Sequence, residues 1–183
     1  MSRISAPARL PWIASLASRA LTWRFGKPFP TLALLSHHPA YPVPYLFITG
    51  LYVNSSTQLN STTKALVSHL VAQLNGCAFC IDLGERVAQG KGLDATKLKW
   101  VLEFRVRPEY SAAERAALEY AWEATQVTAR VSDEVYATLT RFYTEREIIE
   151  LTVAVATENF FNRLTRPLNI ESQGFCALMD HPE

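Results

Sequence analysis

The sequence predicts an all-α protein with a single domain. Apolar residues recur at helical spacing in most segments, and two segments begin with capping boxes, in which Ser or Thr is followed three residues later by Glu. No stretch requires a strand. The 183 residues suffice for one domain with a full core, which we divide into a helical extension over 1–58, a core over 59–170 and a tail over 171–183.

The extension contains three predicted helices. Proline begins the first, over 11–24, and glycine follows it, while a second proline begins the next, over 30–37. The proline-rich stretch that follows cannot be helical throughout. Residues 45–53 suit a strand or a helix and are interpreted as a helix because their neighbours are helical. His37 and His38 are interpreted as a helix end and turn rather than as a metal or base pair.

The core contains further predicted helices, each beginning at a polar capping residue and continuing with apolar residues at helical spacing. They begin at Ser61 or Thr62 (ending at Leu74), at Asp94, at the capping-box residues Ser111 and Thr144, and at Ser132. The helix that begins at Thr144 stops before Pro167, and the tail from Asn169 shows no clear pattern.

A turn signal, Asn75-Gly76, is followed by two cysteines, Cys77 and Cys80, in the first turn of another predicted helix. Residues three apart lie on one face of a helix, so the two thiols can close a small disulfide or react one after the other. The partial positive charge at a helix N-terminus favours the thiolate over the thiol. The pair is therefore a candidate redox site.

Two other roles for the cysteines stay open from the residues alone. Cysteine is among the most often buried residue types, so the pair can simply fill the core. A structural zinc site needs four ligands, but there is no second Cys-x-x-Cys, and Cys176 and the histidines show no regular ligand spacing. We expect no metal and no cofactor.

The chain also shows an internal repeat. When it is shifted so that apolar-periodic segments of the two halves align, Cys77 and Cys80 fall on Asn159 and Asn162. This pattern predicts a duplicated helical hairpin, with thiols in one copy and amides in the other. Asn159, Asn162 and Arg163 then become candidate pocket residues near the thiols. A purely structural polar network at these positions is the alternative.

Charge and hydropathy indicate the class of partner. A net charge of +1 without a basic run argues against a nucleic-acid partner. The longest apolar runs are broken by Pro, Ser or a charge well short of a membrane span, and 12–21 is not a convincing signal peptide. We expect a cytoplasmic protein with no membrane partner. Its 49% hydrophobic residues, with aromatic side chains in several helices, predict a homo-oligomer.

The stretch 74–82, Leu-Asn-Gly-Cys-Ala-Phe-Cys-Ile-Asp, resembles the signature of the carboxymuconolactone decarboxylase / alkylhydroperoxidase D-like superfamily. The resemblance extends to 111–118, 147–152 and 159–163, and so spans most of the core. The N-terminal part resembles an extension found in one branch of the family. The Cys-x-x-Cys context is specific enough for the superfamily but not for one activity.

The resemblance implies an all-helical fold that assembles as dimers, trimers or hexamers. In the alkylhydroperoxidase branch a thiol pair reduces peroxides: the second cysteine attacks, and the first closes the disulfide. Carried over to this chain, Cys80 attacks a hydroperoxide, Cys77 resolves the sulfenic acid, and a dithiol donates electrons. A helix-dipole argument alone favours Cys77 as the attacking thiol. Decarboxylase members lack the cysteine pair, which argues against that activity here.

The chain departs from the active branch at two positions of its proton relay. Gly84 stands where that branch has a histidine, and Ala65 where it has a glutamate. His69, Asp82 and Glu85 are the candidates to take over the proton transfers. The predicted function is a thiol-dependent peroxidase or disulfide oxidoreductase of antioxidant defence. The alternative is a non-enzymatic helical oligomer that binds a small apolar ligand or a partner and uses the cysteines structurally or as a redox sensor.

Overall fold

The structure, a computed structural model, describes residues 2–54 and 58–176, and over these residues it is all-helical, which confirms the predicted fold class. Its elements are α1 (Trp12–Phe25), α2 (Pro30–Leu35), α3 (Pro42–Asn54), α4 (Ser61–Asn75), α5 (Ala78–Gly90), α6 (Ala95–Lys99), a 3₁₀ turn (Val101–Glu103), α7 (Ala112–Thr125), α8 (Asp133–Leu139) and α9 (Glu145–Thr165). Within the described ranges, none of the helices combines the length and apolar character needed to cross a bilayer.

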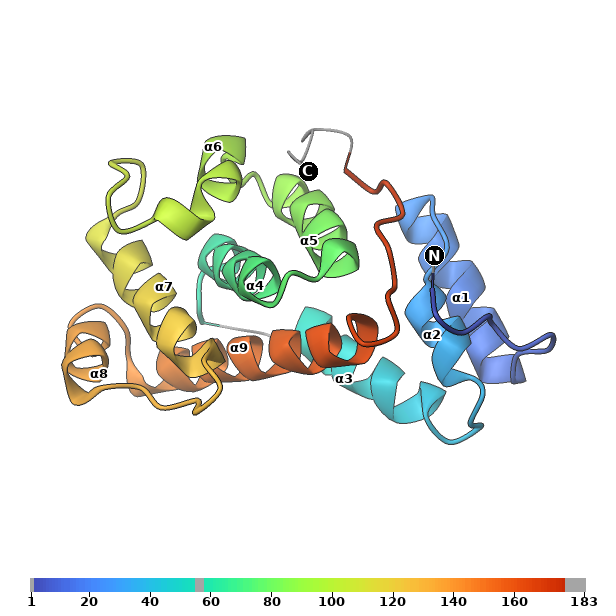
Figure 1. Cartoon of the computed structure of the whole chain (residues 1–183). Coiled ribbons are helices and arrows are strands. Elements are labelled where there is room, and N and C mark those ends of the chain that lie inside the picture. Colours follow the sequence, from blue (N-terminus) through green and yellow to red (C-terminus); the bar gives the residue numbers. More distant parts are fainter. Residues whose placement is uncertain (1, 55–57, 177–183) are drawn as a thin grey trace.

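Helix α4 lies at the centre of the core. It packs against α5, α7 and α9, and Figure 1 shows it enclosed by them. Its residues 63–72 are all buried, and Leu66, Val67, Leu70 and Val71 belong to the main hydrophobic cluster. A helix buried on every side is held in one position. Its C-terminal end therefore gives the cysteine turn a rigid base.

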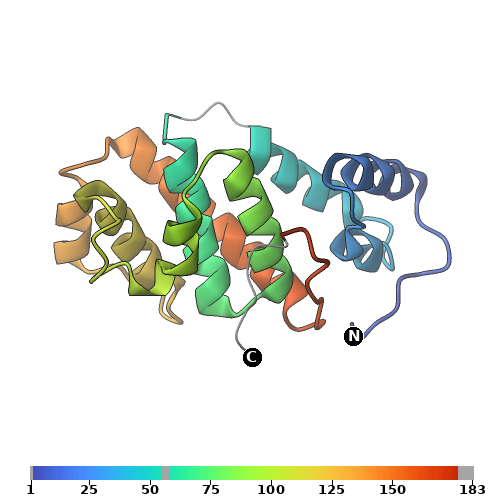
Figure 2. The ribbon, with the colours of Figure 1, turned by 90° about the horizontal axis from the view of Figure 1, so that it is seen from above.

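The three N-terminal helices lie beside the C-terminal half of α9, at one end of the elongated molecule (Figure 2). The ring of Tyr45 on α3 packs against Phe161 on α9, with centroids 5.6 Å apart. Phe29, just before α2, packs against Phe79 on α5 at 6.0 Å. The extension thus contributes side chains to the surroundings of the cysteines.

Both predicted capping boxes are confirmed, at Ser111 and Thr144. The predicted N-cap of α4 is wrong by one or two residues. Asn60, rather than Ser61 or Thr62, caps this helix, with its Oδ1 accepting the Thr62 N–H at 2.9 Å. Asparagine caps a helix as well as serine does. Asn60 holds the cap position because its backbone is not yet helical, with φ of -54° and ψ of 131°.

The second copy of the predicted hairpin repeat is not a hairpin. In the first copy a break at Gly76 separates α4 from α5, whereas the aligned residues, including Asn159 and Asn162, lie in the continuous helix α9. Glu158 stands in the second copy where Gly76 stands in the first. Glutamate favours a helix and disfavours the left-handed conformation that ends α4, so the chain continues without a turn.

Candidate redox site

The two cysteines lie at the break between α4 and α5. Gly76 ends α4 in the left-handed conformation, with φ of 59°. A Cβ at this position would stand 2.8 Å from Nη1 of Arg166, which also donates to the Gly76 carbonyl oxygen. The left-handed backbone conformation therefore favours glycine here, whereas the end of the Arg166 side chain could shift away from a Cβ. Cys77 then caps α5, because its sulfur accepts the Cys80 N–H with an N to S distance of 3.3 Å.

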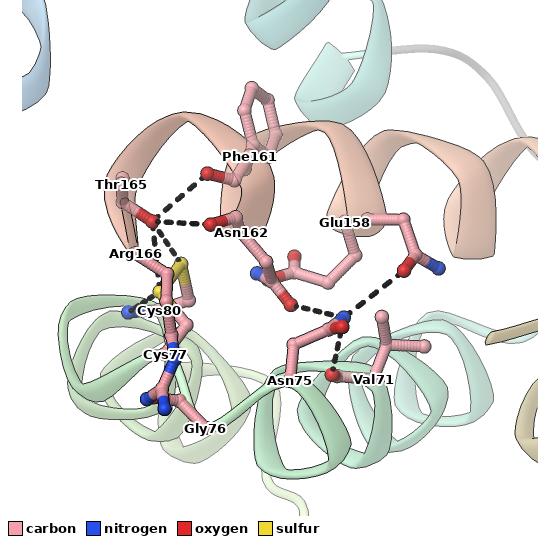
Figure 3. The surroundings of a disulfide bond; sticks show 11 residues. Val71, Asn75, Gly76, Cys77, Cys80, Glu158, Phe161, Asn162, Thr165 and Arg166 are labelled. Atoms are coloured by element: carbon pink, nitrogen blue, oxygen red, sulfur yellow. Dashed lines mark hydrogen bonds between the residues drawn. A yellow bond between two sulfur atoms is a disulfide. The ribbon is translucent and has the colours of Figure 1, made fainter. Parts of the chain in front are cut away.

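Cys77 and Cys80 form a disulfide, with Cα atoms 5.3 Å apart. Figure 3 shows the hydroxyl of Thr165 directed at both sulfurs, 3.0 Å from Cys77 Sγ and 3.4 Å from Cys80 Sγ. The same hydroxyl donates to the Phe161 carbonyl oxygen at 2.9 Å. Thr165 was not predicted as a site residue. Its position could have indicated this role, because it follows the candidate residue Asn162 by three residues and so lies on the same helix face.

The asparagines predicted near the thiols form a polar network with Asn75 at the end of α4. Nδ2 of Asn75 lies 2.9 Å from Asn162 Oδ1 (Figure 3). The same nitrogen lies 3.0 Å from Asn159 Oδ1. Arg163, the third predicted pocket residue, is exposed and donates to Asn159 Oδ1. The network ties the end of α4 to α9 and thereby fixes the turn that carries the cysteines.

Glu158, which was not predicted as a site residue, is a buried carboxyl one turn before Asn162. Its exposed fraction is 8%, and Asn162 Nδ2 donates to its Oε1 at 2.7 Å. Burial raises the pKa of Glu158 to about 7, against the lowering effect of the Asn162 hydrogen bond. In the described part of the chain, no cation forms an ion pair with it.

His69 and Glu85, two of the predicted relay residues, come together between α4 and α5. His69 Nε2 lies 4.0 Å from Glu85 Oε1 and 3.2 Å from the backbone oxygen of Leu98, and both side chains are buried. His69 Nδ1 lies 3.9 Å from the point where a Cβ on Gly84 would stand. Gly84 follows Cys80 by one helical turn, so the imidazole occupies the space beside that turn.

Asp82, the third predicted relay residue, holds the tail. Its carboxylate accepts the Ser172 hydroxyl at 2.7 Å and the N–H groups of Gln173 and Cys176 at 2.9 and 2.8 Å. Burial alone would raise the pKa of Asp82, but hydrogen bonds from the tail outweigh it and hold the pKa below its usual value. The tail, which shows no pattern in the sequence, is thereby fixed against α5.

Aromatic rings from three parts of the chain cover the cysteines. Phe29 from the extension, Phe79 from α5 and Phe175 from the tail pack together, with centroid distances of 5.5, 5.9 and 6.0 Å. They share one hydrophobic cluster with Cys77 and Cys80. Cys77 is 2% exposed and Cys80 8%, so both are buried and Cys80 is the slightly more exposed residue.

A pocket of about 310 Å³ lies between α5, α6 and the tail. Glu85, Leu98 and Trp100 line it, together with Gln89, whose amide donates to Cys176 Sγ at 2.8 Å. Glu85 thus contributes to the wall of this pocket, whereas His69 does not line it. The described residues contain no group of three or more His, Cys, Asp or Glu side chains placed to hold a metal ion.

Comparison with known proteins places the chain in a family. The model of the carboxymuconolactone decarboxylase family matches residues 46–123. The uncharacterized protein YnjA of Escherichia coli (strain K12) is 30% identical over 142 residues, which cover 74% of this chain and 78% of YnjA. YdfG of Bacillus subtilis (strain 168), also uncharacterized, is 32% identical over 110 residues, 60% of this chain and 75% of YdfG. The chain belongs to the carboxymuconolactone decarboxylase / alkylhydroperoxidase D-like superfamily.

Two solved structures share the fold. The alkylhydroperoxidase AhpD core, an uncharacterized peroxidase-related protein from Ralstonia eutropha JMP134, superposes with a TM-score of 0.82 at 14% identity, covering 93% of this chain and 92% of its own. A cysteine-to-alanine variant of the debrominase Bmp8, in complex with 2,3,4-tribromopyrrole, gives a TM-score of 0.82 at 19% identity, with coverage of 96% and 94%.

Proposed function

We propose that the protein is a thiol-dependent oxidoreductase that reduces hydroperoxides with Cys77 and Cys80. The observation that carries this proposal is the pair itself: two cysteines at the start of α5, bonded to each other and touched by the Thr165 hydroxyl. A core-filling pair has no need of a helix N-terminus, whereas a reactive pair gains thiolate character there.

The proposed reaction begins with the Cys80 thiolate attacking one peroxide oxygen. The O–O bond breaks, the departing alkoxide takes a proton to become an alcohol, and Cys80 becomes a sulfenic acid. Cys77 attacks the Cys80 sulfur, the S–O bond breaks, and hydroxide leaves with a proton as water. An external dithiol then reduces the disulfide by exchange. The greater exposure of Cys80 supports its role as the attacking thiol.

His69 and Glu85 supply the proton transfers in this proposal. Both Glu85 Oε1 and the Leu98 carbonyl are acceptors near His69 Nε2, so this nitrogen carries the ring proton and Nδ1 keeps its lone pair. The amide nitrogen of Gln73 also lies 3.4 Å from Nε2, and a turned amide would present its oxygen to the protonated ring nitrogen instead. The base nitrogen thus faces α5 beside Gly84.

This arrangement exchanges the relay partners between helices. The active branch of the family is expected to carry its acid at the position of Ala65 on α4 and its imidazole at the position of Gly84 on α5. Here α4 provides the imidazole of His69 and α5 provides the carboxyl of Glu85. A side chain added at Gly84 would begin in van der Waals contact with the His69 ring, since its Cβ would lie 3.9 Å from Nδ1.

The first prediction tests the pair directly. Peroxide consumption with a dithiol donor should be lost in Cys80→Ser and in Cys77→Ser, because each removes one of the two electron-carrying sulfurs. Cys176→Ser serves as the matched control and should keep the wild-type rate. Wild-type protein that consumes no peroxide, while its pair resists mild oxidants until unfolding, would favour the non-enzymatic alternative instead.

A second prediction concerns the base. Replacement of His69 by glutamine should slow peroxide consumption at neutral pH by about tenfold or more, a modest share of what general base catalysis contributes. The remaining rate should keep rising up to about pH 8.5, the ordinary pKa of a free cysteine. His38→Gln, at an exposed histidine between α2 and α3, is the control. Equal pH–rate profiles for His69→Gln and wild type would remove His69 from the mechanism.

We also propose that the protein functions as a homo-oligomer. Large apolar side chains are exposed on the N-terminal helices: Trp12, Leu16 and Trp23 on α1 and Phe47 on α3, with exposed fractions between 64% and 88%. Burying such side chains stabilises association. Light scattering at micromolar concentration should give a multiple of the chain mass; a monomer mass would contradict the proposal.

A further inference from the structure

Glu158 is a buried carboxyl to which the proposed reaction assigns no role. Glu158, Asn162 and Thr165 are spaced four and three residues apart, so they share one face of α9. That face meets the cysteine turn: Thr165 touches both sulfurs, and Asn162 links the Glu158 carboxyl to Asn75. Figure 3 shows the Glu158 carboxyl beside the Asn162 amide, on the side of α9 that faces α4 and α5.

Among the residues that the structure describes, no positively charged side chain pairs with the Glu158 carboxyl. From α3 it is faced by Tyr45, whose pKa burial raises to about 12, with a further contribution from Glu158. From α4 it is approached by the neutral amide network that includes Asn75. On α9 itself, Arg163 and Arg166 donate to an asparagine side chain and to a backbone carbonyl. Ionised Glu158 would therefore share the buried region with any cysteine thiolate.

We propose that Glu158 is a positioning residue that sets the pH range in which the Cys77–Cys80 pair can form a thiolate. Protonated Glu158 permits the thiolate, and ionised Glu158 opposes it, because two buried negative charges repel. Glu158 and Thr165 are seven positions apart, which is about 10 Å along the helix. At an effective dielectric constant of about 20, two charges at that separation change each other's proton affinity about tenfold.

A role of Glu158 in peroxide reduction rests on the proposed function. Its effect on the thiolate can be tested without peroxide. We would measure the alkylation of reduced protein by iodoacetamide from about pH 5 to about pH 9, in a Cys176→Ser background so that only the pair reacts. Glu158→Gln should react about tenfold faster than the parent near pH 8 and at the same rate near pH 5. Superimposed pH profiles would overturn the proposal.

Two further variants separate this effect from general ones. Glu145→Gln removes an exposed carboxylate from the first turn of the same helix and should leave the profile unchanged; an equal shift in both variants would mark a general charge effect and overturn the proposal. Should Glu158→Gln fail to fold, Asn162→Ala removes the hydrogen bond that lowers the pKa of Glu158. Because Glu158 would then ionise at a higher pH, its slowing effect on alkylation should also begin at a higher pH. A pH profile equal to that of the parent would again overturn the proposal.

Discussion

Glu158→Gln should raise the free energy of unfolding near pH 8 by about 3 kcal/mol and leave it almost unchanged near pH 4. The reason is the raised pKa of about 7 in the folded protein against 4.5 for an ordinary glutamate. Below pH 4.5 the carboxyl is protonated in both states and costs nothing. As pH rises towards 7 the unfolded chain loses this proton while the folded protein retains it, so stability falls; above pH 7 the cost is constant. Glutamine keeps the shape and cannot ionise.

Urea unfolding of the disulfide form at both pH values, comparing variant with wild type at each, measures this difference. Because other groups titrate equally in both proteins, the comparison isolates position 158. Glu145→Gln, exposed at the start of α9, should change stability by less than about 1 kcal/mol at either pH. Equal stability of Glu158→Gln and wild type near pH 8 would show that the carboxylate is not desolvated.

Asp82→Ala should have the second large effect, on the tail. The substitution removes the acceptor for the Ser172 hydroxyl and for two backbone N–H groups, and hydrogen bonds to a charged group are worth about 1.5–3 kcal/mol each. Allowing for partial replacement by water, we expect a loss of about 2–4 kcal/mol. With the tail released, Phe175 no longer covers the cysteines, so a small dithiol should reduce the Cys77–Cys80 disulfide about tenfold faster.

Reduction kinetics and urea unfolding together check this prediction. Ser172→Ala, which removes one of the hydrogen bonds, should show the same changes at a smaller size. Because the pKa of Asp82 is lowered in the folded protein, its contribution is present at neutral pH and is lost only as pH falls below 3.8 and through the folded value. A variant with wild-type reduction kinetics would show that the tail does not limit access to the disulfide.

The local part of the structure could be predicted from the sequence because its signals are local. The capping boxes at Ser111 and Thr144 and the glycine that ends α4 act through residues a few positions away. The same holds for the placement of Cys77 and Cys80 at the start of a helix. The shift of the α4 cap to Asn60 shows the usual error of such signals, since adjacent polar residues compete for one position.

The remainder of the site depends on contacts between distant segments. Asp82 was predicted as a relay residue, but its hydrogen bonds to the tail join residues about 90 positions apart, and no periodicity announces them. Glu158 and Thr165 lie in a helix whose apolar pattern hides which face meets the cysteines. His69 and Glu85 were both predicted as candidate relay residues. Their contact could not be predicted, because it depends on how α4 packs on α5.

The sulfur of Cys77 has a second role as the N-terminal cap of α5, where it accepts the Cys80 N–H. A thiolate accepts such a hydrogen bond more strongly than a disulfide sulfur does, because charge strengthens hydrogen bonding. Cleavage of the disulfide therefore strengthens the start of the helix instead of loosening it. That bias moves the thiol–disulfide equilibrium towards the dithiol under conditions in which Cys77 is ionised.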